Sequence, residues 1–314
     1  MKIIFTTILL FGLLTSACPA QKSESGKTSA ETKPENSNVK QAGGLEKQFA
    51  QIASLAKGRV GVKAEILETG EAVSLNASEQ FPMQSVYKLP IGMAVLKRVD
   101  EGKLRLDQKV RVGKSDFVKQ SMLSPLRDNN PNGAEITVVE LLRLAVSVSD
   151  GTASDVLMKL AGGAAAVQSF LGEIKVSEIM VLNPEKEIGL DWETQYRNWS
   201  TPAGAVELLR AVQEKRGLSA DSGALLLKFL TETKTKPQRL KGLLPKDAVV
   251  AHKTGSSGSR NGVTAATNDI GIVTLPNGNH LAIAVFVSDS PADEKTREEV
   301  IAKIAKAAWD NWSK

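Results

Sequence analysis

A long helical stretch between two strand-rich ends is the feature that most constrains the fold of this chain. Residues 85–235 carry mainly helical patterns of apolar side chains, whereas residues 44–84 and 236–314 carry strand patterns separated by turn signals. Strands from both ends then have to join in one antiparallel sheet. The sequence therefore predicts an α+β fold: an antiparallel sheet flanked by terminal helices, an inserted all-helical part, and a natural site in the cleft between the two parts.

The individual elements follow from apolar periodicity and from start and stop signals. The expected helices span Leu45–Ala56, Leu89–Val99, Val138–Val148, Ala153–Leu160, Ala164–Leu171, Pro202–Gln213, Ser222–Thr231 and Thr296–Trp312. The expected strands span Val60–Leu67, Ala72–Leu75, Val249–Lys253, Thr264–Thr274 and His280–Val287. Turn residues at Thr69-Gly70 and at Pro276-Asn277-Gly278-Asn279 make hairpins of two strand pairs.

The composition is that of an ordinary globular protein, with 42% hydrophobic and 24% charged residues. A formal charge of only +5, no basic run and 4% aromatic residues argue against nucleic-acid binding. His252 and His280 are the only histidines and Cys18 is the only cysteine, so the ligands of a zinc site are lacking. A Ser-His-Asp triad would have to use one of these two strand histidines, and no dinucleotide or phosphate-binding glycine motif is present.

The first residues predict export across a membrane. Residues 1–17 combine a basic start, an apolar run and small residues at the end, which is typical of a secretory signal peptide. Cleavage before Cys18 would leave a cysteine for lipidation, and cleavage after Ala20 by the ordinary signal peptidase is the alternative. Residues 18–43 are polar and charged, so we expect a disordered linker before a catalytic domain at 44–314. These patterns predict a periplasmic protein, lipid-anchored if Cys18 marks the cleavage site.

Three short segments in a fixed order supply the groups of a serine acyl-transfer enzyme that works without histidine. They are Ser85-Val86-Tyr87-Lys88, Ser149-Asp150-Gly151 and Lys253-Thr254-Gly255. Ser85 and Lys88 lie three residues apart at the start of an apolar helix, so the ammonium can reach the hydroxyl. Burial and a second cation would favour the neutral lysine that accepts the hydroxyl proton. The glycine of the third segment would let a substrate backbone approach the strand edge.

Each segment alone also has a simpler structural explanation. Ser54-Leu55-Ala56-Lys57 shows the same Ser-x-x-Lys spacing on an amphipathic surface helix. Ser149 or Asp150 can cap a helix, and Lys253 can be a strand lysine before a turn. All three segments in this order, each in the structural context that the chemistry requires, favour the catalytic interpretation.

From about Leu45 to Trp312 the sequence resembles the class A serine β-lactamases. Besides the three segments, the stretch Asn183-Pro184-Glu185-Lys186-Glu187-Ile188-Gly189, followed by Asn198-Trp199, looks like the Ω loop of the extended-spectrum branch. The resemblance implies that Glu185 activates the water that hydrolyses the acyl-enzyme, with Glu187 as the less favoured candidate.

The resemblance also assigns a role to each catalytic residue. The implied catalytic residues are Ser85, Lys88, Ser149, Glu185 and Lys253. Ser85 would form the acyl-enzyme, and Lys88 and Glu185 would share proton removal in acylation. Ser149 and Lys253 would relay a proton to the lactam nitrogen.

Substrate recognition is assigned in the same way. The backbone N–H groups of Ser85 and Ser256 would form the oxyanion hole. The implied substrate-binding residues are Thr254, Gly255, Ser256, Arg239 and Gly151. Thr267 stands where many members carry an arginine for the substrate carboxylate, so Arg239 would supply that guanidinium instead. A surface arginine is the alternative.

Two positions depart from the family pattern. Gly151 stands where asparagine usually contacts both the lysine of the nucleophile and the side-chain amide of the substrate, so asparagine there is expected to increase kcat/KM for substrates that carry an acylamido side chain. Gly189 stands where asparagine often holds the hydrolytic water. A cell-wall D,D-peptidase is a rival interpretation, which Glu185 disfavours, and a receptor that stays acylated is another. We expect a monomer that hydrolyses small-molecule β-lactams without metal or cofactor.

Overall fold

The computed structural model describes residues 37–313, with side chains from residue 43 onward. The expected signal peptide, Cys18 and the linker up to residue 36 lie outside the described residues. Helix α1 (Ser37–Ala53) begins earlier than expected, so the predicted linker is wrong over residues 37–43, which are helical. Within residues 37–313, no helix is long and apolar enough to cross a membrane.

One antiparallel sheet joins the two ends of the described chain, in the order β2-β1-β11-β10-β8, with β9 paired to β10. Its strands are β1 (Arg59–Ile66), β2 (Ala72–Leu75), β8 (Val250–Ser256), β9 (Ser259–Arg260), β10 (Val263–Thr274) and β11 (His280–Ser290). β1 pairs with β11 along its whole length, from Arg59 opposite Ser288 to Ile66 opposite Leu281. The expectation that both ends contribute to one sheet is therefore confirmed.

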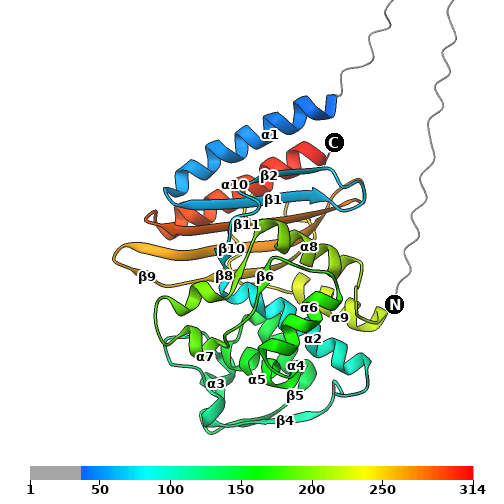
Figure 1. The fold of residues 1–314 in the computed structure, drawn as a ribbon, viewed down its shortest axis with the longest axis vertical. Coiled ribbons are helices and arrows are strands. Elements are labelled where there is room, and N and C mark those ends of the chain that lie inside the picture. The colour runs from blue at the N-terminus through cyan, green and yellow to red at the C-terminus, as the bar shows by residue number, and fades with distance from the viewer. Residues whose placement is uncertain (1–36, 314) are drawn as a thin grey trace, which may run out of the picture. The chain divides into compact units, whose positions relative to one another are not determined.

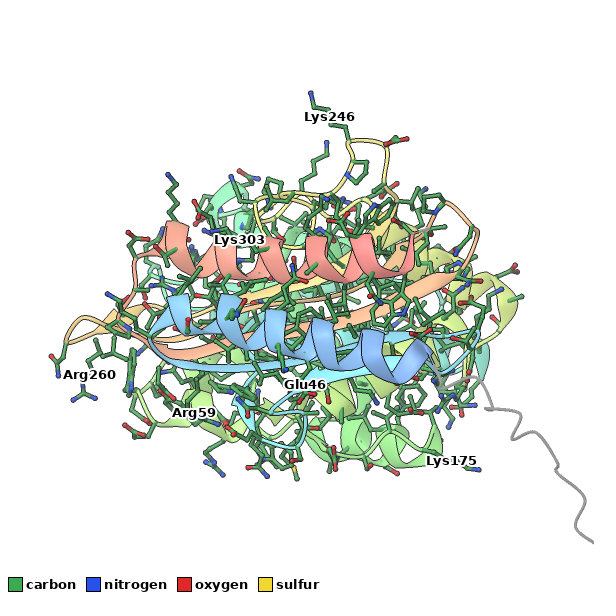
Figure 2. The ribbon with its side chains drawn as sticks, turned by 90° about the horizontal axis from the view of Figure 1, so that it is seen from above. Glu46, Arg59, Lys175, Lys246, Arg260 and Lys303 are labelled. Atoms are coloured by element: carbon green, nitrogen blue, oxygen red, sulfur yellow. The ribbon has the colours of Figure 1, made fainter. Side chains whose placement is uncertain are left out.

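Helices cover both faces of this sheet (Figure 1). α1 and α10 (Glu294–Trp312) lie side by side over one face, as the view in Figure 2 shows, and the helical part covers the other. Strand β11 divides its apolar side chains between two cores because successive side chains point to opposite faces. Ile283, Val285 and Val287 belong to the core under α1 and α10, whereas Ala282, Ala284 and Phe286 belong to the core of the helical part.

The helical part is built from segments that the periodicity predicts to within a few residues. Its main helices are α2 (Lys88–Asp100), α4 (Val138–Arg143), α5 (Gly151–Ala161), α6 (Ala164–Glu173), α8 (Pro202–Gln213) and α9 (Ala220–Thr231). α4 continues into a π-helical turn, η4 (Leu144–Val148), so the two together fill the predicted span 138–148.

Several short elements had no sequence prediction. The helical ones are η2 (Gln84–Tyr87), η3 (Lys114–Asp116), α3 (Pro125–Asn129), α7 (Glu185–Ile188) and η5 (Thr194–Arg197). The short η1 (Ser54–Ala56), by contrast, falls within the helix expected up to Ala56. The strands are β4 (Lys109–Val112) with β5 (Ala134–Thr137), and β3 (Phe81–Pro82), β6 (Ile179–Met180) and β7 (Trp199–Ser200) in a small sheet. These elements matter because η2 and α7 carry residues of the site described next.

Candidate active site

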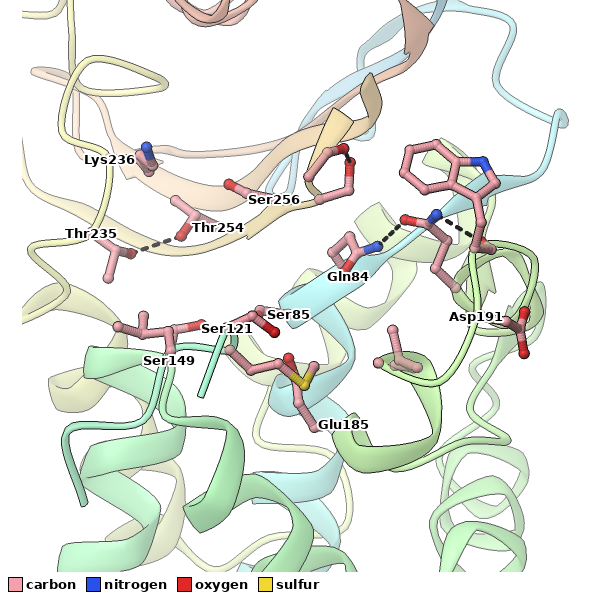
Figure 3. Close-up of a pocket in the computed structure, with 18 residues that line it drawn as sticks. Gln84, Ser85, Ser121, Ser149, Glu185, Asp191, Thr235, Lys236, Thr254 and Ser256 are labelled. Atoms are coloured by element: carbon pink, nitrogen blue, oxygen red, sulfur yellow. Dashed lines mark hydrogen bonds between the residues drawn. The ribbon is translucent and has the colours of Figure 1, made fainter. Parts of the chain in front are cut away.

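A cavity of about 800 Å³ lies between strand β8 and the helical part. Five of the predicted site residues line it, namely Ser85, Ser149, Glu185, Thr254 and Ser256. Figure 3 shows the first three on the helical side and the last two across the cavity on β8. Three segments far apart in the sequence are thus brought to one site, as the motifs predict.

Ser85 is presented by the tight turn η2. The residue before it, Gln84, has a φ of 49°, in the left-handed region that non-glycine residues rarely occupy. Gln84 Nε2 donates a 2.7 Å hydrogen bond to Gln195 Oε1, which holds this turn. A Cβ on Gly255 would lie 2.3 Å from Met83 O. Glycine is therefore required at position 255 for β8 to pack against this turn, and not only for substrate approach as the sequence suggested.

Two buried lysines connect the predicted catalytic groups. Lys88 Nζ donates to Ser149 O at 2.8 Å and forms an ion pair with Glu185 Oε2 at 3.1 Å. Lys253 Nζ donates to Ser149 Oγ at 2.9 Å. Burial, followed by the nearby Lys88 ammonium, lowers the pKa of Lys253 well below its ordinary value. The structure thus forms a chain from Glu185 to Lys253, in which Lys88 contacts these partners and not the Ser85 hydroxyl.

Ser149 and Asp150 have different roles in the second segment. Ser149 has a φ of 67° at the end of η4, which places its hydroxyl beside Lys253. The Asp150 carboxylate caps α5 by accepting from Ala153 N at 2.9 Å, and it accepts from Leu126 N at 2.7 Å. The capping explanation therefore holds for Asp150, whereas Ser149 lines the cavity.

Glu185 begins helix α7, and Asp155 on α5 fixes its backbone. The Asp155 carboxylate accepts from Glu185 N at 2.6 Å and from Lys186 N at 3.0 Å. Burial raises the pKa of Asp155 to about 6, although these N–H groups act in the opposite direction. Glu187 accepts from Asn183 Nδ2 at 2.5 Å and does not line the cavity. Of the two candidates, Glu185 is the one that faces the site.

Gly151 does not line the cavity, contrary to the expectation that it contacts substrate. It is buried at the start of α5, and its N–H donates to Leu123 O at 2.9 Å. A Cβ there would lie 2.9 Å from Glu185 Cγ and 3.4 Å from Val118 Cγ1. An asparagine at position 151 would therefore have to displace Glu185, which argues against the expected gain in kcat/KM.

Gly189, the other departure, does line the cavity. A Cβ there would lie 2.8 Å from Met122 Sδ, and the Gly189 carbonyl accepts from Lys119 Nζ at 2.8 Å. The missing side chain thus leaves room for a neighbouring methionine on the cavity wall.

Arg239 is neither a surface arginine nor a residue that lines the cavity. It is 1% exposed, and Nη1 donates to Gly255 O at 2.9 Å and to Asn268 O at 2.8 Å. Nη2 donates to Ser256 Oγ at 2.7 Å, and Nε donates to Glu298 at 3.3 Å. The guanidinium therefore lies one hydrogen bond behind Ser256 and does not reach the cavity, which the predicted direct contact with a substrate carboxylate would require.

A second group of residues around β8 was not expected from the sequence. Thr235 and Lys236 line the cavity, and the Thr235 hydroxyl lies 2.7 Å from the Thr254 hydroxyl (Figure 3). The Lys236 ammonium forms a 2.5 Å ion pair with Glu294. These residues belong to a loop without periodicity or motif, so no sequence signal marked them.

The histidines do not take part in this site. His252 Nδ1 lies 3.0 Å from the Asp269 carboxylate, and its Nε2 has no hydrogen-bond partner among the described residues. His280 Nδ1 lies 2.6 Å from Glu68 on the surface. No group of three or more metal-binding side chains comes together within residues 37–313.

Comparison with known proteins agrees with this arrangement. Residues 44–312 match the model of the β-lactamase enzyme family. The chain is 42% identical over 265 residues to the extended-spectrum β-lactamase PER-1 of Pseudomonas aeruginosa, covering 84% of this chain and 86% of that protein. It is 38% identical to β-lactamase VEB-1 of the same organism, covering 86% and 91%.

Solved structures give the same result. A β-lactamase from Chitinophaga pinensis DSM 2588 is 44% identical with a TM-score of 0.83, covering 85% of this chain and 98% of that one. TLA-3 extended-spectrum β-lactamase is 41% identical with a TM-score of 0.84, covering 87% and 100%. The chain belongs to the β-lactamase enzyme family, in its class A serine branch.

Proposed function

We propose that this protein hydrolyses β-lactam antibiotics through an acyl-enzyme on Ser85 that is released by water activated at Glu185. The observation that carries the proposal is the chain of contacts Glu185–Lys88–Ser149–Lys253 in the site that also presents Ser85. It supplies a carboxylate for each proton removal and an ammonium beside the second serine for proton donation.

The chemistry proceeds in two halves. In acylation, Ser85 Oγ attacks the lactam carbonyl and its proton passes to the Lys88 and Glu185 pair. The C–N bond of the ring then breaks, and the nitrogen receives a proton from Lys253 through Ser149. The proton taken from Ser85 passes from the Lys88 and Glu185 pair back to Lys253, so Glu185 is ionised again. In deacylation, Glu185 removes a proton from water, the hydroxide attacks the ester carbonyl, and the ester C–O bond breaks as Glu185 returns that proton to Ser85 Oγ.

Substrate recognition uses groups from both walls of the cavity. The backbone N–H groups of Ser85 and Ser256 stabilise the oxyanion, where one donor is typically worth about 3 kcal/mol. Thr254 and Ser256 offer hydroxyls to the substrate carboxylate, and Arg239 holds Ser256 in place.

Hydrolysis of a chromogenic cephalosporin, combined with peptide mapping of the acylated protein, tests this proposal. Ser85→Ala should abolish turnover and the mass adduct. Ser54→Ala is the matched control, because Ser54 and Lys57 share the spacing but Ser54 is exposed and donates to Gln51 O. Turnover that survives in Ser85→Ala would refute the proposal, and a single burst without turnover would favour the acylated receptor or the D,D-peptidase.

We also propose that the chain is exported to the periplasm and tethered by a lipid on Cys18. The support is the signal-peptide pattern of residues 1–17 and the polar stretch that follows. Fractionation of cells that express the full chain should place the enzyme with the membrane, and Cys18→Ala should release it into the soluble periplasmic fraction. A wild-type enzyme found only in the soluble fraction would favour cleavage after Ala20.

A further inference from the structure

We propose that Tyr87 is a positioning residue for deacylation, which holds the Glu185 carboxylate through a hydrogen bond from its hydroxyl. The inference rests on the proposed role of Glu185 as the base, and it adds a residue to which no role in the reaction has been assigned. Tyr87 Oη donates to Glu185 Oε2 at 2.5 Å, which is the short distance of a charge-assisted bond.

The fold makes Tyr87 a rigid donor. It is the last residue of η2, the turn that presents Ser85, and it directly precedes Lys88 at the start of α2. Its side chain is fully buried. Burial and the neighbouring carboxylate raise the pKa of Tyr87 well above its ordinary value, so the hydroxyl keeps its proton. One turn therefore carries the nucleophile, a lysine and the donor that orients the base.

Glu185 is restrained from the other side as well. Its Cγ lies against the open backbone of Gly151, and Asp155 holds its N–H. Oε2 receives both the Tyr87 hydroxyl and the Lys88 ammonium, and Glu185 lines the cavity. The carboxylate is thus held through one of its oxygens at the wall of the cavity.

This arrangement predicts a selective effect on the second half of the reaction. A donor to the ionised carboxylate favours that form, and it also limits the carboxylate to one orientation. The charged and titratable groups around Glu185 are Tyr87, Lys88, Asp155 and Lys253. Among them only Tyr87 can be substituted so that its hydrogen bond to Glu185 is removed while the net charge of the site stays the same.

Tyr87→Phe is the direct test because it removes one oxygen and keeps the ring. We expect the acylation rate to change less than threefold and the deacylation rate to fall about tenfold, so that acyl-enzyme accumulates. We also expect the acidic limb of the kcat profile to move to higher pH. Tyr196→Phe is the matched control, since Tyr196 Oη donates to Asp289 at 2.6 Å outside the cavity. The Tm of this control should fall by the amount that loss of such a hydrogen bond generally causes. The acidic limb of its kcat profile should not move.

A double-mutant cycle separates this inference from the proposed function. If Tyr87 acts through Glu185, adding Tyr87→Phe to Glu185→Gln should change deacylation less than twofold. Normal deacylation in Glu185→Gln alone would refute the role of Glu185. Loss in Glu185→Gln together with an unchanged rate and pH profile in Tyr87→Phe would overturn the inference about Tyr87 alone.

A second probe keeps the test decisive if Tyr87→Phe does not fold. The chain has only two tyrosines, so 3-fluorotyrosine incorporated into Tyr196→Phe labels Tyr87 alone. Fluorine makes the hydroxyl a stronger donor at little cost in size. The acidic limb should then move to lower pH, opposite to the effect of phenylalanine, and an unmoved limb would overturn the inference.

Discussion

Replacing Gly151 by alanine tests how tightly Glu185, the proposed base, is packed. The added Cβ would lie 2.9 Å from Glu185 Cγ, about 0.6 Å short of the 3.5 Å at which two carbons make favourable contact. It would also lie 3.3 Å from Leu123 O and 3.4 Å from Val118 Cγ1, so it cannot move away from the glutamate. Glu185 must therefore retreat, and the bond to Tyr87 opposes that movement.

The size of the effect follows from these distances. Overpacking of a filled site costs about 1–3 kcal/mol, and we expect Gly151→Ala to lose about 1–2 kcal/mol of unfolding free energy. A misplacement of 1 Å can cost about a hundredfold in rate, so a shift of roughly half that size should slow deacylation about tenfold. Urea unfolding measures the first quantity, and rapid-quench analysis of the acyl-enzyme measures the second.

Gly172→Ala provides the matched control. Gly172 also lies in a helix, α6, but a Cβ there meets nothing within 4 Å. This variant should gain up to about 1 kcal/mol through helix propensity and keep full activity. If Gly151→Ala matches Gly172→Ala in both stability and deacylation, Glu185 is free to move and the packing argument is wrong.

Three further predictions concern the base, the arginine and the buried aspartate. Glu185→Gln should accumulate acyl-enzyme after a burst, as seen by intact mass, whereas Glu187→Gln should turn over normally; the reverse result would move the base by two residues. Arg239→Ala should cost about 3–5 kcal/mol in urea unfolding, because buried acceptors and a carboxylate lose their donor. The substitution should also raise KM more than it lowers kcat, because the Ser256 hydroxyl loses its hydrogen bond from Arg239. An unchanged KM would show that Arg239 does not contribute to substrate binding. Because the pKa of Asp155 is raised to about 6, the folded state keeps a proton that the unfolded chain releases near pH 4. The contribution of this proton to the free energy of unfolding is complete below pH 4 and is lost as the pH rises through 6. Asp155→Asn should flatten the stability profile between pH 4 and 7, and an unchanged slope would contradict the raised pKa.

Elements with a strong repeating pattern could be predicted from the sequence. The span 202–213 was expected as a helix and is α8, because Pro202 stands at its first position and apolar residues recur along one face. The long strands β10 and β11 were found in the same way. By contrast, β3, β6 and β7 have two residues each, too few for any periodicity, and they exist only because the fold brings them together.

The site was predictable in its residue types and less so in its contacts. Ser85, Ser149 and Lys253 carry motifs, and their convergence follows from the predicted sheet. The roles of Tyr87 and Gly151 depend on where Glu185 lies, a residue distant from both in the sequence. Arg239 was placed in the wrong environment because its loop has no pattern that indicates burial. Such contacts are set by tertiary packing, which local sequence does not encode.

The pairing of β1 with β11 has a consequence for how this enzyme folds during its synthesis. Ile66 finds its partner only at Leu281, so a chain made from its N-terminus cannot close its sheet until nearly all of it has emerged. Until then β1 presents a bare edge that other unfinished chains can pair with. Ser85 is synthesised early, yet Lys253, Thr254 and Ser256 join its site only when β8 is in place. Activity therefore requires synthesis of the chain through β11. Chains that end before β11 should show no hydrolysis.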